Sequence, residues 1–440
     1  MDNPSSPDNA ITPFAITNYR DIRRRFGIRQ KNRRGHMYIV GKTGTGKSTL
    51  LLNMASHDME AGYGLALIDP HGDLAEEILD CVPSSRINDV IYLNPSDLEY
   101  PLAFNPLDHV ARDQRDLVVS GMISTLKKVW SDFWGPRLEH ILRNALLTLL
   151  ENPESTLLDV PRLLTDEQFR ELAVRRVTHP QVRNFWFSEF AKYSAWMRSE
   201  AVSPILNKVG QFLTSTPLRN IVGQRKSALR FRKIMDEGKI FIANLSKGRI
   251  GEDNSSLLGA MLVTRIQLAA LSRTDLPEAR RRPFYFYVDE FHDFLTLSFA
   301  DILSSSRKYG LNLVLAHQHL GQLDEKLRGA ILGNVGTVIS FRVGAEDAEL
   351  LAKEFYPVFG AADLVRLPNY HIYLKLLIDG APSEPFSAFT LLPRSRNTSH
   401  KQEIIDHSRR QYAQPRREVE QAMVLAGVQP AQRTEQRRLI

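Results

Sequence analysis

The sequence contains a single cysteine, Cys81, in 440 residues. One cysteine excludes an internal disulfide, and this usage is typical of a reducing compartment. The chain also lacks an apolar run of the roughly 18 residues that a membrane-spanning helix needs. The best candidate, residues 257–271, is interrupted by Thr264, Arg265 and Gln267. Residues 1–17 are polar and Pro-rich, unlike a signal peptide or anchor. We therefore expect a cytoplasmic protein with no direct membrane anchor.

Metal-ligand spacing is missing as well. His71, His292 and His317 are not grouped with other ligands, so the sequence predicts no zinc site. Hydrophobic residues make up 43% and charged residues 24%, which is ordinary for a globular protein. The net charge of +7 is concentrated at the two ends. Such basic segments are either solvated faces or contacts to nucleic acid phosphates.

The two basic ends have different compositions. Residues 19–34 carry eight Lys or Arg residues against one acid, Asp21. Residues 394–440 carry ten Lys or Arg residues and five acids. We treat residues 1–34 as an N-terminal basic arm and residues 394–440 as a basic C-terminal tail.

The clearest motif matches the phosphate-loop pattern G-x-x-x-x-G-K-[ST] at residues 41–48. Residues 36–40 before it have the pattern of a buried strand, and residues 48–54 after it begin a helix, which is the setting the motif requires. Backbone N–H groups, the Lys47 ammonium and the helix N-terminus would surround a triphosphate, and the Ser48 hydroxyl would ligate Mg²⁺. The predicted nucleotide contacts are Gly41, Lys42, Thr43, Gly44, Thr45, Gly46, Lys47, Ser48 and Thr49.

An apolar segment, residues 284–288, ends in Asp289 and Glu290. In nucleoside triphosphatases a strand of this kind lies beside the phosphate loop. Its Asp holds the water shell of the Mg²⁺ ion, and the next Glu can polarise the attacking water. The sequence therefore predicts that Asp289 binds the metal and that Glu290 is the catalytic base.

Several short apolar runs are typical of buried parallel strands. Helical patterns separate many of them, so we expect an α/β fold with a mostly parallel sheet, whose ligands bind at the carboxyl ends of the strands. The predicted strands are 64–68, 89–93, 239–245, 284–288, 311–316, 335–343 and 371–378.

Lys47 and Asp289 are separated by far more chain than a compact nucleotide-binding core needs. Between them, residues 138–149 place apolar residues at the spacing of one helix face. We therefore predict a helical insertion at 111–235, between the two parts of the core at 35–110 and 236–393. An aromatic cluster in this insertion would either stack nucleobases or pack its helices; its members are Phe185, Trp186, Phe187, Tyr193 and Trp196.

Further candidate site residues follow the acidic pair. Gln318 ends a predicted strand beside the acidic strand, where it would reach the γ-phosphate or act as a capping amide. Arg307 lies near a predicted helix end and is a candidate arginine finger for a neighbouring subunit, with Arg342 as the second candidate. Asp69 follows another strand, where it would orient the metal's surroundings or cap the next helix.

Six motifs, which are named in chain order at the end of this paragraph, resemble those of the HerA/FtsK superfamily of DNA-pumping ATPases. The chain is most similar to the branch of type IV secretion coupling proteins and their soluble relatives, the TraG/TraD-like DNA-transfer ATPases. The resemblance covers about residues 35–393. The motifs are the phosphate loop, Ile-Asp-Pro-His-Gly-Asp-Leu at 68–74, Phe-Asn-Pro-Leu at 104–107, Val-Asp-Glu-Phe at 288–291, Arg-Lys-Tyr-Gly-Leu at 307–311 and Ala-His-Gln at 316–318.

This resemblance implies a RecA-like P-loop core and a ring hexamer that hydrolyses ATP at its subunit interfaces and holds DNA in its channel. It assigns Lys47, Ser48, Asp289, Glu290, Gln318 and Arg307 to the phosphate-loop, acidic-pair, sensor and finger positions. The helical insertion matches the all-alpha domain of the family. Coupling proteins usually carry an N-terminal membrane anchor, and this sequence shows none.

We therefore expect an ATP-hydrolysing DNA translocase that uses Mg²⁺. Two alternatives stay open. One is a HerA-like motor that works with a nuclease in DNA processing or defence. The other is a nucleotide-controlled module that recruits cargo and moves little DNA. A relaxase, a nuclease and a secretion-channel component are the candidate protein partners, besides further copies of the chain.

Overall fold

The computed structural model describes residues 9–131, 134–295, 303, 306–393 and 399–425. The chain divides into two compact units. The first comprises Met1–Leu93 and Phe231–Ser408, and the second comprises Asn94–Arg230 and Arg409–Ile440. The helical segment thus leaves the first unit at residue 94, earlier than the predicted boundary at 111.

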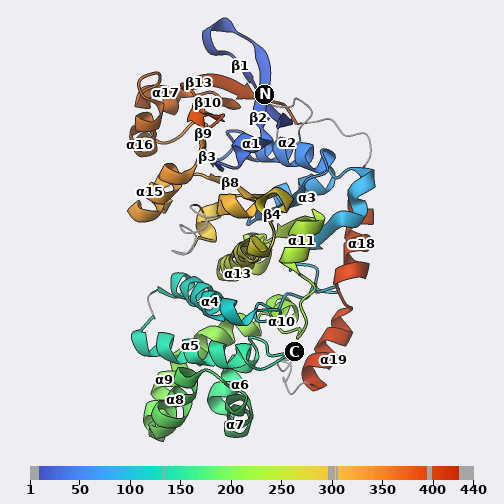
Figure 1. Cartoon of the computed structure of the whole chain (residues 1–440), viewed down its shortest axis with the longest axis vertical. Coiled ribbons are helices and arrows are strands. Elements are labelled where there is room, and N and C mark those ends of the chain that lie inside the picture. The colour runs from blue at the N-terminus through green and yellow to red at the C-terminus, as the bar shows by residue number, and fades with distance from the viewer. Residues whose placement is uncertain (1–8, 132–133, 296–302, 304–305, 394–398, 426–440) are drawn as a thin grey trace, which may run out of the picture. The chain divides into compact units, whose positions relative to one another are not determined.

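An eleven-stranded sheet forms the centre of the first unit (Figure 1). Its strand order is β2-β1-β13-β10-β9-β3-β8-β7-β4-β6-β5. The strands are β1 (Ile11–Thr17), β2 (Arg24–Arg29), β3 (Met37–Val40), β4 (Gly64–Asp69), β5 (Val90–Leu93), β6 (Ile240–Asn244), β7 (Phe284–Val288), β8 (Leu311–His317), β9 (Thr337–Ser340), β10 (His371–Lys375) and β13 (Phe386–Thr390). A separate two-stranded ribbon pairs β11 (Leu377–Ile378) with β12 (Ala381–Pro382).

The seven strands from β9 to β5 pair in parallel, so the predicted α/β sheet is confirmed. β8 lies between the acidic strand β7 and the phosphate-loop strand β3. One detail of the prediction is wrong. The run 371–378 is not one parallel strand, because β10 pairs antiparallel with β9 and the chain turns before β11.

The segments Ile11–Thr17 and Arg24–Arg29 are strands of this sheet rather than parts of an arm. β1 pairs antiparallel with β13, and β2 pairs with β1 as the outermost strand. The short helix α1 (Gln30–Arg33) follows, and the Arg33 side chain is only 1% exposed. The treatment of residues 1–34 as a basic arm is therefore wrong for residues 9–34. Alternation within β1 buries Thr12 and Phe14, which ties this segment to the core.

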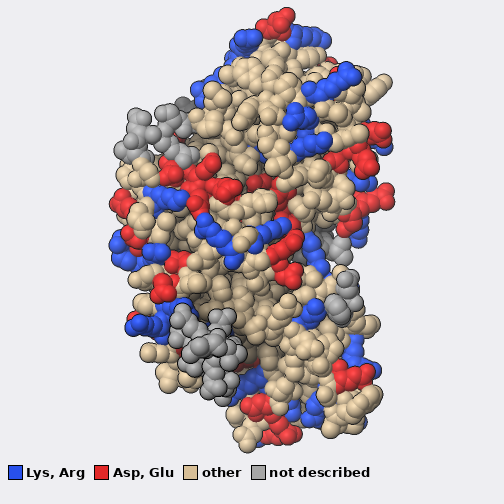
Figure 2. Space-filling view, turned by 180° about the vertical axis from the view of Figure 1, so that it is seen from behind, with Lys and Arg blue, Asp and Glu red and all other residues tan. Residues whose placement is uncertain are grey.

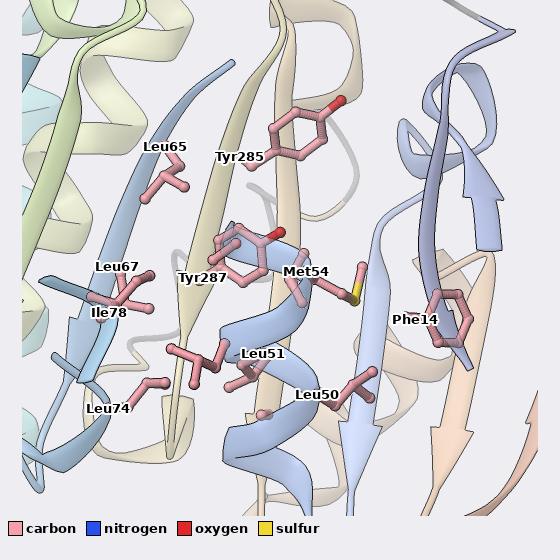
Figure 3. Close-up of a cluster of buried hydrophobic side chains, with 14 of the residues drawn as sticks. Phe14, Leu50, Leu51, Met54, Leu65, Leu67, Leu74, Ile78, Tyr285 and Tyr287 are labelled. Atoms are coloured by element: carbon pink, nitrogen blue, oxygen red, sulfur yellow. The ribbon is translucent and has the colours of Figure 1, made fainter. Parts of the chain in front are cut away.

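The first helix after the phosphate loop, α2 (Lys47–Glu60), packs on one face of the sheet. Figure 3 shows Leu50, Leu51 and Met54 of α2 among side chains from β4 and β7. Residues of β3, β4 and β7 are buried on both faces, as their continuous apolar patterns require. The rigid sheet and α2 together fix the position of the loop between them.

Further helices of the first unit follow or precede strands of the sheet. They are α3 (Asp73–Leu79), α11 (Phe231–Glu237), α12 (Lys247–Ile250), α13 (Glu252–Leu271), α15 (Glu325–Asn334), α16 (Ala345–Phe355) and α17 (Ala361–Arg366). Within the described parts of the chain, one segment, Glu252–Asp275, is long and apolar enough to cross a membrane, but 67% of its apolar window is buried in the protein, as in a core helix.

The second unit is helical. Its helices are α4 (Arg115–Val129), α5 (Pro136–Leu150), α6 (Asp159–Thr165), α7 (Glu167–Arg175), α8 (Pro180–Asn184), α9 (Ala195–Thr214), α10 (Thr216–Val222) and α19 (Arg416–Leu425). Helix α18 (Lys401–Tyr412) runs from the first unit into the second. In the aromatic cluster, Phe185 and Trp186 are buried and pack edge to face, whereas Phe187 and Trp196 are exposed.

Charges of both signs are interspersed on the face drawn in Figure 2, without one dominant basic patch. The described part of the predicted C-terminal tail is largely helical, because α18 and α19 occupy most of residues 399–425. Ile404 of α18 is fully buried, and Arg409 pairs with Asp97 at 2.7 Å. Residues 394–398 and 426–440 of the predicted tail lie outside the described residues.

Candidate active site

The phosphate loop connects β3 to α2, as its pattern predicts. Gly44 and Gly46 have φ angles of 76° and 116°, which side-chain-bearing residues rarely adopt. The Thr45 hydroxyl donates a hydrogen bond to the carbonyl of Lys42 at 2.6 Å. The loop is also tied to the flanking strands, because the Gly41 N–H donates to His317 O and the Lys42 N–H donates to Arg342 O. These contacts hold an open turn at the carboxyl end of β3.

Lys47 is buried within this loop. Its Nζ donates to the carbonyl oxygen of Gly41 at 2.6 Å and to that of Lys42 at 3.3 Å. Burial lowers the pKa of Lys47, while Glu290 and Asp289 act in the opposite direction. The Lys47 ammonium group is therefore bound by carbonyl oxygens of its own loop, and phosphate oxygens of a ligand would compete with them for it. Ser48, the next residue, is exposed at the helix N-terminus.

The acidic pair lies beyond β8 and still reaches the loop. Asp289 and Glu290 are 5% and 4% exposed. Gln318, at the end of β8, bridges the gap: its Nε2 donates to Glu290 Oε1 at 2.8 Å, and its Oε1 accepts from the Thr43 hydroxyl at 2.8 Å. An amide side chain is needed here, because it must donate on one side and accept on the other. Gln318 therefore joins the acidic pair to the phosphate loop.

The acids crowd one another. Burial raises the pKa of Asp289 to about 7, with Asp69 and Glu290 adding to the rise and Lys47 opposing it. Asp69 accepts hydrogen bonds from the N–H groups of His71 and Ala75, so it caps the start of α3 as well as facing Asp289. Both roles that the sequence left open for Asp69 are thus compatible with its position.

Glu290 has an unusual backbone and an incomplete set of partners. Its φ of 44° places it in the left-handed region, a conformation that concentrates at active sites. Among the described residues, its Oε2 accepts no hydrogen bond, although His292 Nδ1 lies 3.5 Å away. A buried carboxylate oxygen without a donor is the kind of group to which a water or cation would bind.

Two residues of this region, His292 and Tyr370, are not among the predicted site residues. His292 follows the acidic pair and lies between Glu290 and Asp293, with Nε2 3.5 Å from Asp293 Oδ1. Tyr370 precedes β10, and its ring lies against Gly46. The short spacing of His292 from Glu290 was a usable signal for the first. Nothing in the sequence places Tyr370, because it reaches the loop through the antiparallel half of the sheet.

The two candidate finger arginines lie in different places. Arg307 is exposed and precedes β8, at the amino edge of the strands, whereas the phosphate loop follows β3 at the carboxyl edge. Arg307 is therefore outside its own chain's pocket. Arg342 is half-buried beside the loop and donates to Asn369 Oδ1 at 2.9 Å. The helix predicted before Gly310 falls partly outside the described residues; the described part, Ser306–Tyr309, is a 3₁₀ turn.

A cavity of about 210 Å³ lies over the loop. It is lined by Thr43, Gly44, Gly46, Lys47, Ser48, Thr49, His71, Asp289, Glu290, Gln318 and Tyr370. Its donor set suits a metal-bound polyphosphate, because it combines an ammonium, a helix N-terminus, a hydroxyl and a raised-pKa carboxyl group. Ser48 and Asp289 would offer the hard oxygen ligands that Mg²⁺ prefers, and a divalent cation would offset the negative charge of the crowded acids.

Comparison with known proteins gives one family and a consistent fold. A model described as the type IV secretion-system coupling protein DNA-binding domain matches residues 26–370. The bacterial conjugative coupling protein TrwBΔN70, in its unbound monoclinic form, matches with a TM-score of 0.60 and 16% identity, covering 90% of each chain. No curated protein matches the sequence.

Two further structures agree. TrwB in complex with ADP and Mg²⁺ matches with a TM-score of 0.62 and 17% identity, over 85% of this chain and 90% of that one. VirB4 of Thermoanaerobacter pseudethanolicus matches with a TM-score of 0.56 and 12% identity, over 90% of this chain and 100% of that one. At these identities the likeness shows the fold, a RecA-like core with a helical domain.

Proposed function

The chain belongs to the family of type IV secretion-system coupling protein DNA-binding domains, and from this premise we propose that it is an ATP-hydrolysing motor that moves DNA. The observation that carries the proposal is the convergence of the phosphate loop, the acidic pair and Gln318 on one cavity. TrwB, which shares the fold, has been determined with ADP and Mg²⁺. We accordingly assign ATP and Mg²⁺ to this cavity.

In this proposal the residues divide the work of binding. Backbone N–H groups of residues 44–49 and the Lys47 ammonium hold the β- and γ-phosphates, and Lys47 leaves the carbonyl oxygens of Gly41 and Lys42 to do so. Ser48 and Asp289 hold Mg²⁺, which supplies positive charge at the phosphate oxygens. The Mg²⁺ ion that accompanies the nucleotide would also favour ionised Asp289, whose pKa burial raises.

Glu290 is the proposed base. Its Oε2, which accepts no hydrogen bond from the described residues, would accept a proton from the attacking water, while its Oε1 accepts a hydrogen bond from Gln318. Gln318 in turn contacts Thr43 of the loop, so a change in the loop on phosphate release alters the orientation of the base. This contact gives Gln318 its proposed sensor role.

We further propose that activity requires several copies, as in a ring hexamer, with Arg307 acting on a neighbour's nucleotide. An arginine that acts in trans must be exposed and outside its own pocket, and Arg307 meets both conditions. Arg342 is the weaker candidate because Asn369 already binds its guanidinium. DNA is the proposed partner along with other copies of the chain, and a relaxase, nuclease or channel component would supply the cargo.

The test is ATP turnover by the purified full chain with and without single- and double-stranded DNA, together with its mass in solution. We expect DNA to stimulate turnover and the active species to contain several copies. Turnover that is indifferent to DNA would favour a cargo-recruiting module instead. Lys47→Ala is the control for the site: if it retains most of the turnover, the assignment of the cavity is wrong.

Glu290→Gln separates binding from chemistry. The amide keeps the shape of the side chain and loses the base, so nucleotide affinity should change little. Turnover should fall by about 100-fold or more, the scale of a lost general base. Wild-type turnover in Glu290→Gln would place the base elsewhere.

A further inference from the structure

The phosphate loop accounts for one half of a nucleoside triphosphate and leaves the nucleoside unassigned. The strand order places the acids and Tyr370 on opposite sides of the loop, because β7 lies two strands from β3 on one side and β10 lies two strands from it on the other. The γ-phosphate must face the acids and Gln318. The ribose and base therefore leave the loop on the side away from the acids, which is the side of Tyr370.

Tyr370 is held at this exit by its backbone. Its N–H donates to the carbonyl of Thr45 in the loop at 2.8 Å, and its own carbonyl accepts from the Thr390 N–H at 2.8 Å. Its φ of 67° lies in the left-handed region, where a bulky residue is strained. Such strain is retained only where the surroundings over-determine it, and it concentrates at ligand sites.

The ring of Tyr370 packs closely against the phosphate loop, and the residue is also partly exposed. Its Cδ1 lies 2.8 Å from where a Cβ on Gly46 would be, so only glycine at that position lets the ring approach the loop. The side chain lines the cavity beside Ser48 and Thr49, yet Tyr370 is 44% exposed. An aromatic ring that is anchored on one side and exposed on the other is a stacking surface.

We propose that Tyr370 is the nucleobase platform of the site, on which the planar base of the bound nucleoside triphosphate stacks. The proposal rests on the proposed nucleotide site, and it assigns a contact to the nucleoside, the part of the ligand that the phosphate loop does not bind. Stacking on a tyrosine needs the π-face of the ring and not its hydroxyl, so phenylalanine serves the same role.

The experiment compares two ligands that share the phosphates and differ in the nucleoside. Binding of Mg²⁺–ATP and of Mg²⁺–tripolyphosphate to the full chain is measured by calorimetry for wild type, Tyr370→Phe, Tyr370→Ala and Tyr370→Gly. The glycine variant tolerates the positive φ, so it removes the ring without adding backbone strain. Phe187→Ala, which removes an exposed aromatic ring of the second unit, is the matched control.

We expect Tyr370→Ala and Tyr370→Gly to weaken ATP binding by roughly 5- to 150-fold, the range of base–aromatic stacking. Tyr370→Phe and Phe187→Ala should stay within about threefold of wild type. Tripolyphosphate affinity should be the same in all five proteins. Unchanged ATP affinity in Tyr370→Gly, or an equal loss for both ligands, would overturn the proposal. Failure of wild type to bind either ligand would instead refute the phosphate site.

Discussion

Replacing Arg33 by Met should destabilise the first unit strongly, because it would leave a buried carboxylate without its cation. Arg33 and Asp58 are 1% and 0% exposed and form two hydrogen bonds, of 2.6 Å from Nη1 to Oδ1 and 2.9 Å from Nη2 to Oδ2. Tyr287 joins the pair, donating to Asp58 Oδ2 at 2.6 Å, and the guanidinium lies 3.8 Å from the centroid of the Tyr285 ring.

The magnitude follows from this burial. Breaking a buried pair by removing one partner costs about 3–5 kcal/mol, whereas an exposed pair contributes about 0–1 kcal/mol. Domains of this order lose about 2–4 °C of Tm per kcal/mol, so Arg33→Met should lower Tm by about 6–20 °C. The matched control is Arg29→Met, whose partner Asp379 is 50% exposed at 3.3 Å. It should change Tm by a few degrees at most.

The assay is thermal unfolding followed by circular dichroism on the full chain. All four tryptophans lie in the second unit, so tryptophan emission reports that unit separately. The double variant Arg33→Met/Asp58→Asn should be less destabilised than the sum of the singles by about 1–3 kcal/mol, since no charge then remains buried. A Tm for Arg33→Met equal to that of Arg29→Met, or strict additivity in the double variant, would refute the reasoning.

Two further predictions concern the site. Because burial holds the folded pKa of Asp289 near 7, above its usual 3.8, the stability contributed by its neutral form is lost as pH rises from about 4 to about 7. Without nucleotide, the unfolding free energy of Asp289→Asn should therefore rise by about 2–3 kcal/mol relative to that of wild type between pH 5 and pH 8. Glu278→Gln, at an exposed acid, is the control and should show no such gain. Parallel curves of unfolding free energy against pH for Asp289→Asn and wild type would contradict the shift in pKa. If Arg307 acts in trans, mixing inactive Arg307→Ala and Lys47→Ala chains should restore part of the ATP turnover, and no recovery in a verified mixed assembly would count against it.

Local patterns predicted the parallel half of the sheet because those strands are short, buried and apolar throughout. The strand–loop–helix setting of residues 41–48 is likewise a local property, so the loop could be placed from the sequence. The family resemblance is confirmed by the match over residues 26–370. The roles of Lys47, Ser48, Asp289, Glu290, Gln318 and Arg307 stay predictions, because proximity does not demonstrate chemistry.

The remaining features could not be read from the sequence because they depend on pairing between distant segments. β1 and β2 join the sheet through β13, more than 370 residues away in the register Ala15–Thr390. Tyr370 reaches the phosphate loop only because β10 pairs back on β9. Arg33 carried the charge pattern of a solvated basic segment, and only the buried Asp58 of α2 shows that its charge is internal.

The burial of Arg33 limits what the basic ends can contribute to DNA binding. Arg33 is buried, and Arg29 and Lys31 share Asp379, at 3.3 and 3.1 Å. At the C-terminal end, Arg409 pairs with Asp97 and α18 contributes Ile404 to the core. Deleting residues 394–440 would therefore remove packed helices along with their charge. Substitution in the β1–β2 turn is the cleaner perturbation.

Four exposed arginines lie where β1 turns into β2: Arg20 and Arg23 in the turn, and Arg24 and Arg25 at the start of β2. None of the four forms an ion pair with another described residue. Each phosphate that an arginine neutralises on duplex DNA steepens the plot of log K against log salt by about 0.9. Changing all four to serine should therefore flatten the slope by up to about 3.6 if this turn binds DNA. The control Arg29→Ser removes one positive charge that is already paired with Asp379, so it should leave the slope nearly unchanged. Equal slopes in wild type and the fourfold variant would show that this turn is a solvated surface and that DNA is bound elsewhere.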